Sequence, residues 1–105
     1  MIHVVTAENR AAYRRELAQM FAERAAFFID RLGWPLTRNA DGGEQDCHDD
    51  AEAIYFLVLD RAGDVSASCR ARPFAGGELL NGLVGASATA PRSCWELSRI
   101  MLSSP

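Results

Sequence analysis

An acidic loop is the first segment whose residues could do chemistry. Residues 44–50 read Glu-Gln-Asp-Cys-His-Asp-Asp, which places four carboxylates within seven positions. Carboxylates this close repel one another unless cations lie beside them. The loop is therefore a solvated surface segment, a metal site using Asp46, His48 and Asp49, or a partner for arginines elsewhere in the chain. Because the spacing matches neither an EF-hand nor a zinc motif, we expect no metal.

Arg24 stands where an apolar residue is expected. It lies four residues after Met20 and four before Phe28, on the apolar stripe of a helical pattern. A guanidinium keeps its charge, so a buried one needs a carboxylate or a substrate as its partner. The alternative is that the stem packs while the charged head reaches water. Pairing of Arg24, Arg70 and Arg99 with the loop acids would satisfy both sets of charges, so we predict that these residues line one hollow.

Two charges, Glu96 and Arg99, interrupt an apolar stretch near the carboxyl end. In a regular strand, residues three apart point to opposite faces of the sheet. A β-bulge near Leu97 or Ser98 would bring both side chains to the same face. The alternative is an edge strand whose charges prevent aggregation.

The elements that must position these residues follow a mixed α/β order. The apolar pattern predicts a long helix over residues 7–32, continuous or bent, which Gly33 and Pro35 end. Residues 38–50 are polar and rich in glycine and aspartate, as in a loop. Strands are expected at residues 2–5, 53–60, 65–72 and 94–102.

The apolar runs add detail to this outline. The run at residues 54–59 is typical of a central strand buried on both faces, and residues 94–102 are a third central candidate. Between these strands, residues 73–91 are irregular, with a short helix expected at 78–84. An exposed last strand would allow self-association of the chain.

Composition narrows the class of protein. The chain has 105 residues, enough for a single domain over 1–105, and its net charge of −3 argues against a nucleic-acid partner. All 11 basic residues are arginine. The three cysteines form no C-x-x-C pair, which argues against a disulfide framework and favours a reducing compartment. With no signal-peptide pattern and no long apolar run, we expect a cytoplasmic protein without a membrane span.

Four motifs, in order and with matching spacing, resemble the acyl-homoserine-lactone (autoinducer) synthase family. Residues 20–34 are similar to its amino-terminal signature, and Glu44-x-Asp46-x-x-Asp49 to its acidic motif. Arg70-x-x-Pro73 and Trp95-Glu96-x-Ser98-Arg99 resemble two of its strand motifs. Some positions depart from the pattern, among them His48, Ala71 and Phe74, and these changes affect packing more than charge.

The resemblance implies a GCN5-related acetyltransferase-like mixed sheet with flanking helices, truncated after about the fourth strand. It also implies a reaction in which an acyl group passes from acyl carrier protein to the α-amine of S-adenosylmethionine. The carboxylate of S-adenosylmethionine then closes the lactone and expels methylthioadenosine, so S-adenosylmethionine is a substrate and no cofactor is expected.

Residue roles follow from the resemblance by position. It implies that the S-adenosylmethionine site is built from Arg24, Phe28, Trp34, Asp46 and Asp49. It implies that Glu96 is the general base and that Arg70 and Arg99 complete the catalytic group. Acids, an arginine and aromatic rings suit a ligand that carries a sulfonium, an ammonium and a carboxylate.

Length separates this chain from the family pattern, because family members are about twice as long. The acyl-thioester cleft is therefore expected to be incomplete, and the chain an inactive fragment of a synthase. Two alternatives are a small coenzyme A-dependent N-acetyltransferase and a non-catalytic binding module that a partner chain completes. The absence of a glycine-rich phosphate loop after the last strand counts against the acetyltransferase.

Overall fold

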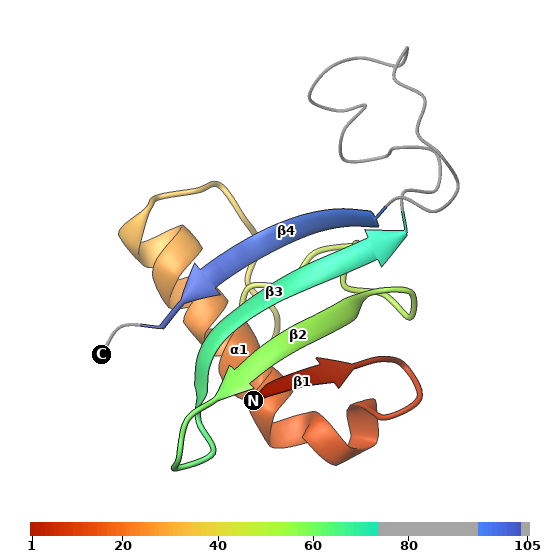
Figure 1. Cartoon of the computed structure of the whole chain (residues 1–105). Coiled ribbons are helices and arrows are strands. Elements are labelled where there is room, and N and C mark those ends of the chain that lie inside the picture. The colour runs from red at the N-terminus through yellow and green to blue at the C-terminus, as the bar shows by residue number, and fades with distance from the viewer. Residues whose placement is uncertain (74–94, 104–105) are drawn as a thin grey trace.

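The computed structural model describes residues 1–73 and 95–103. Its sheet has four strands in the order β1-β2-β3-β4, and all three pairings are antiparallel. The strands, shown in Figure 1, are β1 (Ile2–Val5), β2 (Ile54–Leu59), β3 (Val65–Pro73) and β4 (Trp95–Leu102). The α/β class and the four expected strands are thus confirmed. The helix expected at residues 78–84 lies outside the described residues.

One helical arm packs across the sheet (Figure 1). It begins as a 3₁₀ turn, η1 (Arg10–Tyr13), continues as α1 (Arg14–Arg24), and ends as a π-helix, η2 (Ala25–Arg31). Gly33 follows with φ +71°, a conformation that suits glycine after a helix end. The change from α to π at Ala25 agrees with an arm of two segments.

The predicted helix start at residue 7 is wrong. The Asn9 side chain accepts a hydrogen bond from the Thr6 backbone N–H at 2.7 Å, and the Asn9 N–H donates to the Thr6 carbonyl. Such local bonds offer the backbone an alternative to the helix, so regular α-structure begins only at Arg14.

The core lies between the helical arm and one face of the sheet. It contains Val5, Leu17, Met20, Phe28, Ala53, Tyr55, Leu57 and Met101. In β2, Tyr55 and Leu57 are buried, whereas Ile54, Phe56 and Val58 on the other face are only half-buried. The expectation that β2 is buried on both faces is therefore wrong for the described residues, because the arm covers a single face.

β4 lies at one end of the described strand order and pairs with β3 alone, so its predicted central position is not seen in the described sheet. It carries a bulge, because Ser68 pairs with Met101 but Arg70 with Ser98, which leaves an extra residue in β4. Arg99, with φ +53°, sits in this bulge. A bulge was predicted near Leu97 or Ser98, and the observed one follows Ser98 directly. Within residues 1–73 and 95–103, no helix is long and apolar enough to span a membrane.

Candidate functional site

Arg24 is held inside the protein by two carboxylates of the acidic loop. Its side chain is 1% exposed. Its Nη1 and Nη2 donate to the two carboxylate oxygens of Asp49 at 2.8 and 2.9 Å, and its Nε donates to Glu44 Oε1 at 3.0 Å. The snorkelling alternative is therefore wrong. The two-pronged contact is the geometry that a guanidinium makes best with a carboxylate.

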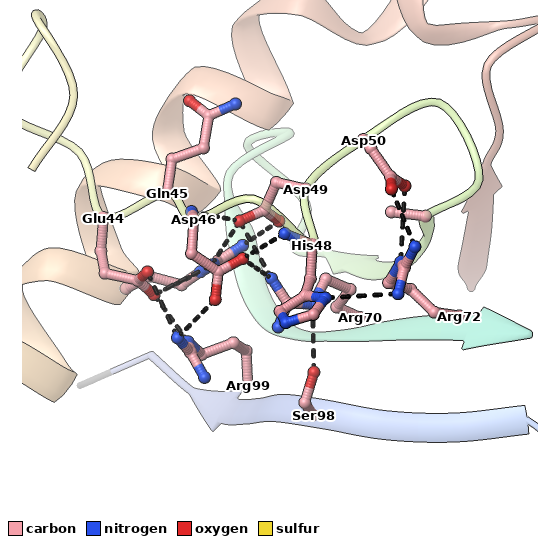
Figure 2. A network of polar contacts seen from close by, with 12 residues as sticks. Glu44, Gln45, Asp46, His48, Asp49, Asp50, Arg70, Arg72, Ser98 and Arg99 are labelled. Carbon is pink, nitrogen blue, oxygen red and sulfur yellow. Dashed lines mark hydrogen bonds and ion pairs between the residues drawn. The ribbon is translucent and has the colours of Figure 1, made fainter. Parts of the chain in front are cut away.

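Arg70 and Arg99 reach the same acids from the sheet (Figure 2). Arg70 Nη1 contacts Asp46 Oδ1 at 2.7 Å and Asp49 Oδ2 at 3.0 Å. Arg99 donates from Nε to Glu44 Oε1 at 2.7 Å and from Nη2 to Asp46 Oδ2 at 3.0 Å. The predicted convergence of three distant arginines on the loop acids is thus confirmed, whereas the hollow that they were expected to line stays a prediction. We call these three arginines with Glu44, Asp46 and Asp49 the charged cluster.

Local backbone contacts aim the loop carboxylates. The Glu44 N–H donates to the Phe21 carbonyl at 2.9 Å, which ties the loop to α1. This approach requires glycine at position 43, because a Cβ there would lie 2.8 Å from the Phe21 Cβ. Within the loop, the Asp46 N–H donates to Asp49 Oδ2 and the His48 N–H to Asp46 Oδ1, both at 2.9 Å. These turns point the acids toward the sheet.

The bulge in β4 aims Arg99. A non-glycine residue at φ +53° is strained, and such strain persists where surrounding contacts fix it. Here the fixing contacts are the ion pairs to Glu44 and Asp46 and the packing of the guanidinium 5.7 Å from the centre of the Phe28 ring. The Arg99 charge therefore points inward, and an edge charge that only prevents aggregation is the wrong interpretation.

Asp49 pairs with two arginines, Arg24 and Arg70. Burial acts to raise its pKa, but the hydrogen bonds and charge of Arg24, helped by Arg70, outweigh burial and hold the pKa well below its usual range. Tyr55 also donates its hydroxyl to Asp49 Oδ1 at 2.8 Å. Asp49 is thus ionised at neutral pH, as the pairing with two guanidinium groups requires.

This lowered pKa predicts an acid-sensitive fold. A carboxyl whose pKa is lower in the folded than in the unfolded chain adds stability above its unfolded pKa, and that stability is lost as pH falls through the folded pKa. We expect Asp49→Asn to cost about 1.5–3 kcal/mol at pH 7, the range for hydrogen bonds to charged groups. The difference from the wild type should shrink as the pH is lowered below about 4. Urea unfolding of both proteins between pH 7 and pH 2 measures it, and a pH-independent difference would contradict the assignment.

The charged cluster also bears on the metal alternative. One oxygen from each of Glu44, Asp46 and Asp49 lies within 4.8 Å of the others, a spacing that could hold an ion. Each of these carboxylates is already paired with at least one arginine. The guanidinium groups occupy the positions in which a cation would be stabilised, so these carboxylates serve as partners for arginine.

Phe28 and Trp34 form an aromatic pair beside the cluster. Their ring centres are 4.8 Å apart, and the backbone N–H of Trp34 donates to the backbone carbonyl of Phe28 at 2.8 Å. Phe28 is buried, whereas Trp34 is 44% exposed. Since Arg99 packs against Phe28, the aromatic pair and the charged cluster adjoin each other, and Trp34 offers a ring face at the surface.

Glu96 comes from the strand that supplies Arg99. The β3–β4 register places it opposite Arg72, next to the Arg70–Ser98 pair on the same face of the sheet. Its side chain is half-buried. Arg72 pairs in turn with Asp50 at 2.8 Å, and its Nη1 lies 3.3 Å from His48 Nδ1. A second charged group thus adjoins the charged cluster.

Three contributors to the site were not predicted as site residues. Glu44 is fully buried and bridges Arg24 and Arg99. The Ser98 hydroxyl accepts a hydrogen bond from Arg70 Nε at 3.0 Å. The Tyr55 hydroxyl donates a hydrogen bond to Asp49. Glu44 and Ser98 stand within the motifs that carried the resemblance, which could have marked them. Tyr55 follows only from the fold, because in the sequence it is one aromatic residue in an apolar strand.

Comparison with known proteins identifies the lineage. The sequence profile of the autoinducer synthase family matches residues 8–102. The chain belongs to the autoinducer synthase family. It is 38% identical over 60 residues to the isovaleryl-homoserine lactone synthase of Bradyrhizobium diazoefficiens. These 60 residues make up 57% of this chain and 27% of that protein.

Solved structures agree with this family assignment. MesI, described as a CoA-dependent acyl-homoserine lactone synthase, superposes with a TM-score of 0.81 at 27% identity, covering 97% of this chain and 53% of MesI. BjaI, described in the same terms and solved with SAM and isopentyl-CoA, superposes with a TM-score of 0.78 at 30% identity, covering 97% of this chain and 50% of BjaI. The chain thus spans about half the length of these solved proteins.

Proposed function

We propose that this chain is the part of an acyl-homoserine lactone synthase that binds S-adenosylmethionine. The observation that carries the proposal is the buried charged cluster beside the aromatic pair of Phe28 and Trp34. Aromatic ring faces attract a sulfonium by about 0.5–2 kcal/mol. BjaI, on which 97% of this chain superposes, was solved with SAM bound, which supports the choice of ligand.

The residue roles belong to this proposal. Trp34 contacts the ligand with its exposed ring, and the buried Phe28 packs against Trp34. Arg24, Asp46 and Asp49 shape the site. Glu96 accepts a proton from the ammonium of S-adenosylmethionine, and the free amine then attacks the thioester carbon. As the C–N bond forms, the thioester C–S bond breaks, and the thiolate takes the second amine proton and leaves as the thiol. The substrate carboxylate then attacks its own γ-carbon, and the C–S bond breaks with its electron pair going to the sulfonium sulfur. Arg70 and Arg99 hold the acids and Ser98 in place around this reaction.

The acyl donor is an acyl thioester in this proposal. The motif resemblance predicts acyl carrier protein as the carrier of the acyl group, and this remains a prediction. MesI and BjaI are described as CoA-dependent, which supports an acyl-CoA as the alternative donor. The inactivity of the 105 residues on their own is also a prediction, which lactone formation by the purified chain would contradict.

A thermal-shift experiment tests ligand binding. A ligand at 100 times its Kd stabilises the folded chain by about 2.7 kcal/mol. We expect S-adenosylmethionine at that excess to raise the Tm of the wild type, and Trp34→Ala to reduce the rise, because this variant loses about 0.5–2 kcal/mol of attraction to the sulfonium. Trp95→Ala is the matched control, because Trp95 is 51% exposed, similar to Trp34 at 44%, but lies on β4. An equal loss of the shift in both variants, or no shift in the wild type, would contradict the proposal.

A further inference from the structure

A cavity of about 510 Å³ lies between the helical arm and the loop of residues 39–45. Its lining includes Arg10, Arg14, Leu17 and Phe21 from the arm and Asp41 and Gln45 from the loop. In Figure 2, Gln45 points away from Glu44 and Asp46. One side of the acidic loop therefore faces the charged cluster, and the opposite side faces this cavity.

The polar part of the cavity favours a single negative charge. Arg10 and Arg14 bring two positive charges and Asp41 one negative charge, which leaves one net positive charge. Arg10 Nη2 donates to the carbonyl oxygens of Asp50 and Ala53, but its buried Nε has no hydrogen-bond partner among the described residues. The guanidinium of Arg14 is exposed, so an acceptor placed in the cavity gains a charge-assisted hydrogen bond from it.

The helical arm also gives the cavity an apolar wall. Leu17 and Phe21 form it together with Ala18 and Ala22, whose small side chains leave room above the arm. The volume lies within the range of about 300–1,000 Å³ that small-molecule sites occupy. An apolar wall favours a ligand with a hydrocarbon body, whereas a fully hydrated dianion would gain nothing from it.

We propose that this cavity binds a small monocarboxylic acid with an apolar body. The carboxylate lies between Arg10 and Arg14, and the hydrocarbon part packs on Leu17 and Phe21. This site is separate from the proposed S-adenosylmethionine site, since it lies on the other side of the loop and selects an anion. Its failure would therefore leave the proposed function untouched.

An NMR titration of the 105-residue chain with hexanoate tests the proposal. We expect saturable shifts of the backbone amides of Ala22, Gly43 and Gln45, with a Kd of about 1 mM. Hexan-1-ol lacks the charge and inorganic phosphate lacks the apolar body, so each should bind at least about tenfold more weakly. Saturation by phosphate at the same concentration, or the absence of saturable hexanoate shifts up to about 20 mM, would overturn the proposal.

Two surface variants locate the site. Ala18→Trp fills the cavity from an exposed helical position, and Arg14→Gln removes one of its charges without touching the charged cluster. Both should weaken hexanoate binding by about tenfold or more. Arg31→Gln, an exposed arginine at the far end of the arm, is the matched control and should bind as the wild type does. Unchanged hexanoate affinity in Ala18→Trp would place the ligand elsewhere and overturn the assignment.

Discussion

Replacing Arg24 with methionine is expected to destabilise the chain by about 3–5 kcal/mol, because removing one partner of a buried ion pair leaves uncompensated charge behind. Glu44 and Asp49 would remain inside the protein, each with a side chain that is 0% exposed. Methionine fills much of the space of the arginine stem, so the loss reports the charge more than a cavity. Urea unfolding at pH 7 measures the change.

Arg15→Met is the matched control for this substitution. Arg15 also forms ion pairs, with Glu16 at 3.6 Å and Asp64 at 3.5 Å, but its side chain is 63% exposed. Solvent screens such pairs, so the control should cost less than about 1 kcal/mol. Equal costs for the two substitutions would mean that the Arg24 contacts do not organise the fold.

Replacing Glu96 with glutamine is expected to slow acyl transfer by about 10²–10⁴-fold, the usual contribution of a general base. Glutamine keeps the shape of the side chain but cannot accept the ammonium proton. The affinity for S-adenosylmethionine should stay close to that of the wild type, because the aromatic pair and the charged cluster are unchanged. Loss of affinity together with rate would instead indicate that Glu96 holds the ligand.

This experiment needs a protein that catalyses acyl transfer. Since 97% of the chain superposes on 50% of BjaI, a hybrid in which residues 1–105 replace that part of BjaI supplies one. Methylthioadenosine release is followed with an acyl-CoA and with acylated carrier protein, which also compares the two donors. Glu52→Gln, an exposed loop glutamate, serves as the control. Release at the wild-type rate by Glu96→Gln would exclude the proposed base.

Charge made the cluster predictable, since Arg24 on an apolar stripe and four nearby acids in a loop each needed partners. The choice among those acids was not predictable in the same way. A loop has no fixed period, and Glu44 points inward because its N–H bonds to the Phe21 carbonyl and its carboxylate pairs with two arginines. The full role of Glu44 therefore emerged only from the folded backbone.

Two features of the strands show where pattern reasoning stops. An unbroken apolar run such as residues 54–59 fits burial on one face or on both, and only the position of the helical arm decides between them. The bulge in β4 depends on Arg99 adopting φ +53°, for which an arginine in a strand gives no signal. Its existence and approximate position followed from the charges at Glu96 and Arg99, but the residue with the unusual backbone conformation did not.

The most direct test of the account is a calorimetric titration of the chain with S-adenosylmethionine and, separately, with S-adenosylhomocysteine. The two ligands share the adenosine and amino-acid groups, but the second lacks the sulfonium charge. If the Trp34 ring, packed on Phe28, contacts the sulfonium, S-adenosylmethionine should bind about 2- to 30-fold more tightly, the equivalent of 0.5–2 kcal/mol. Equal affinities, or tighter binding of the uncharged ligand, would contradict the assignment of this site.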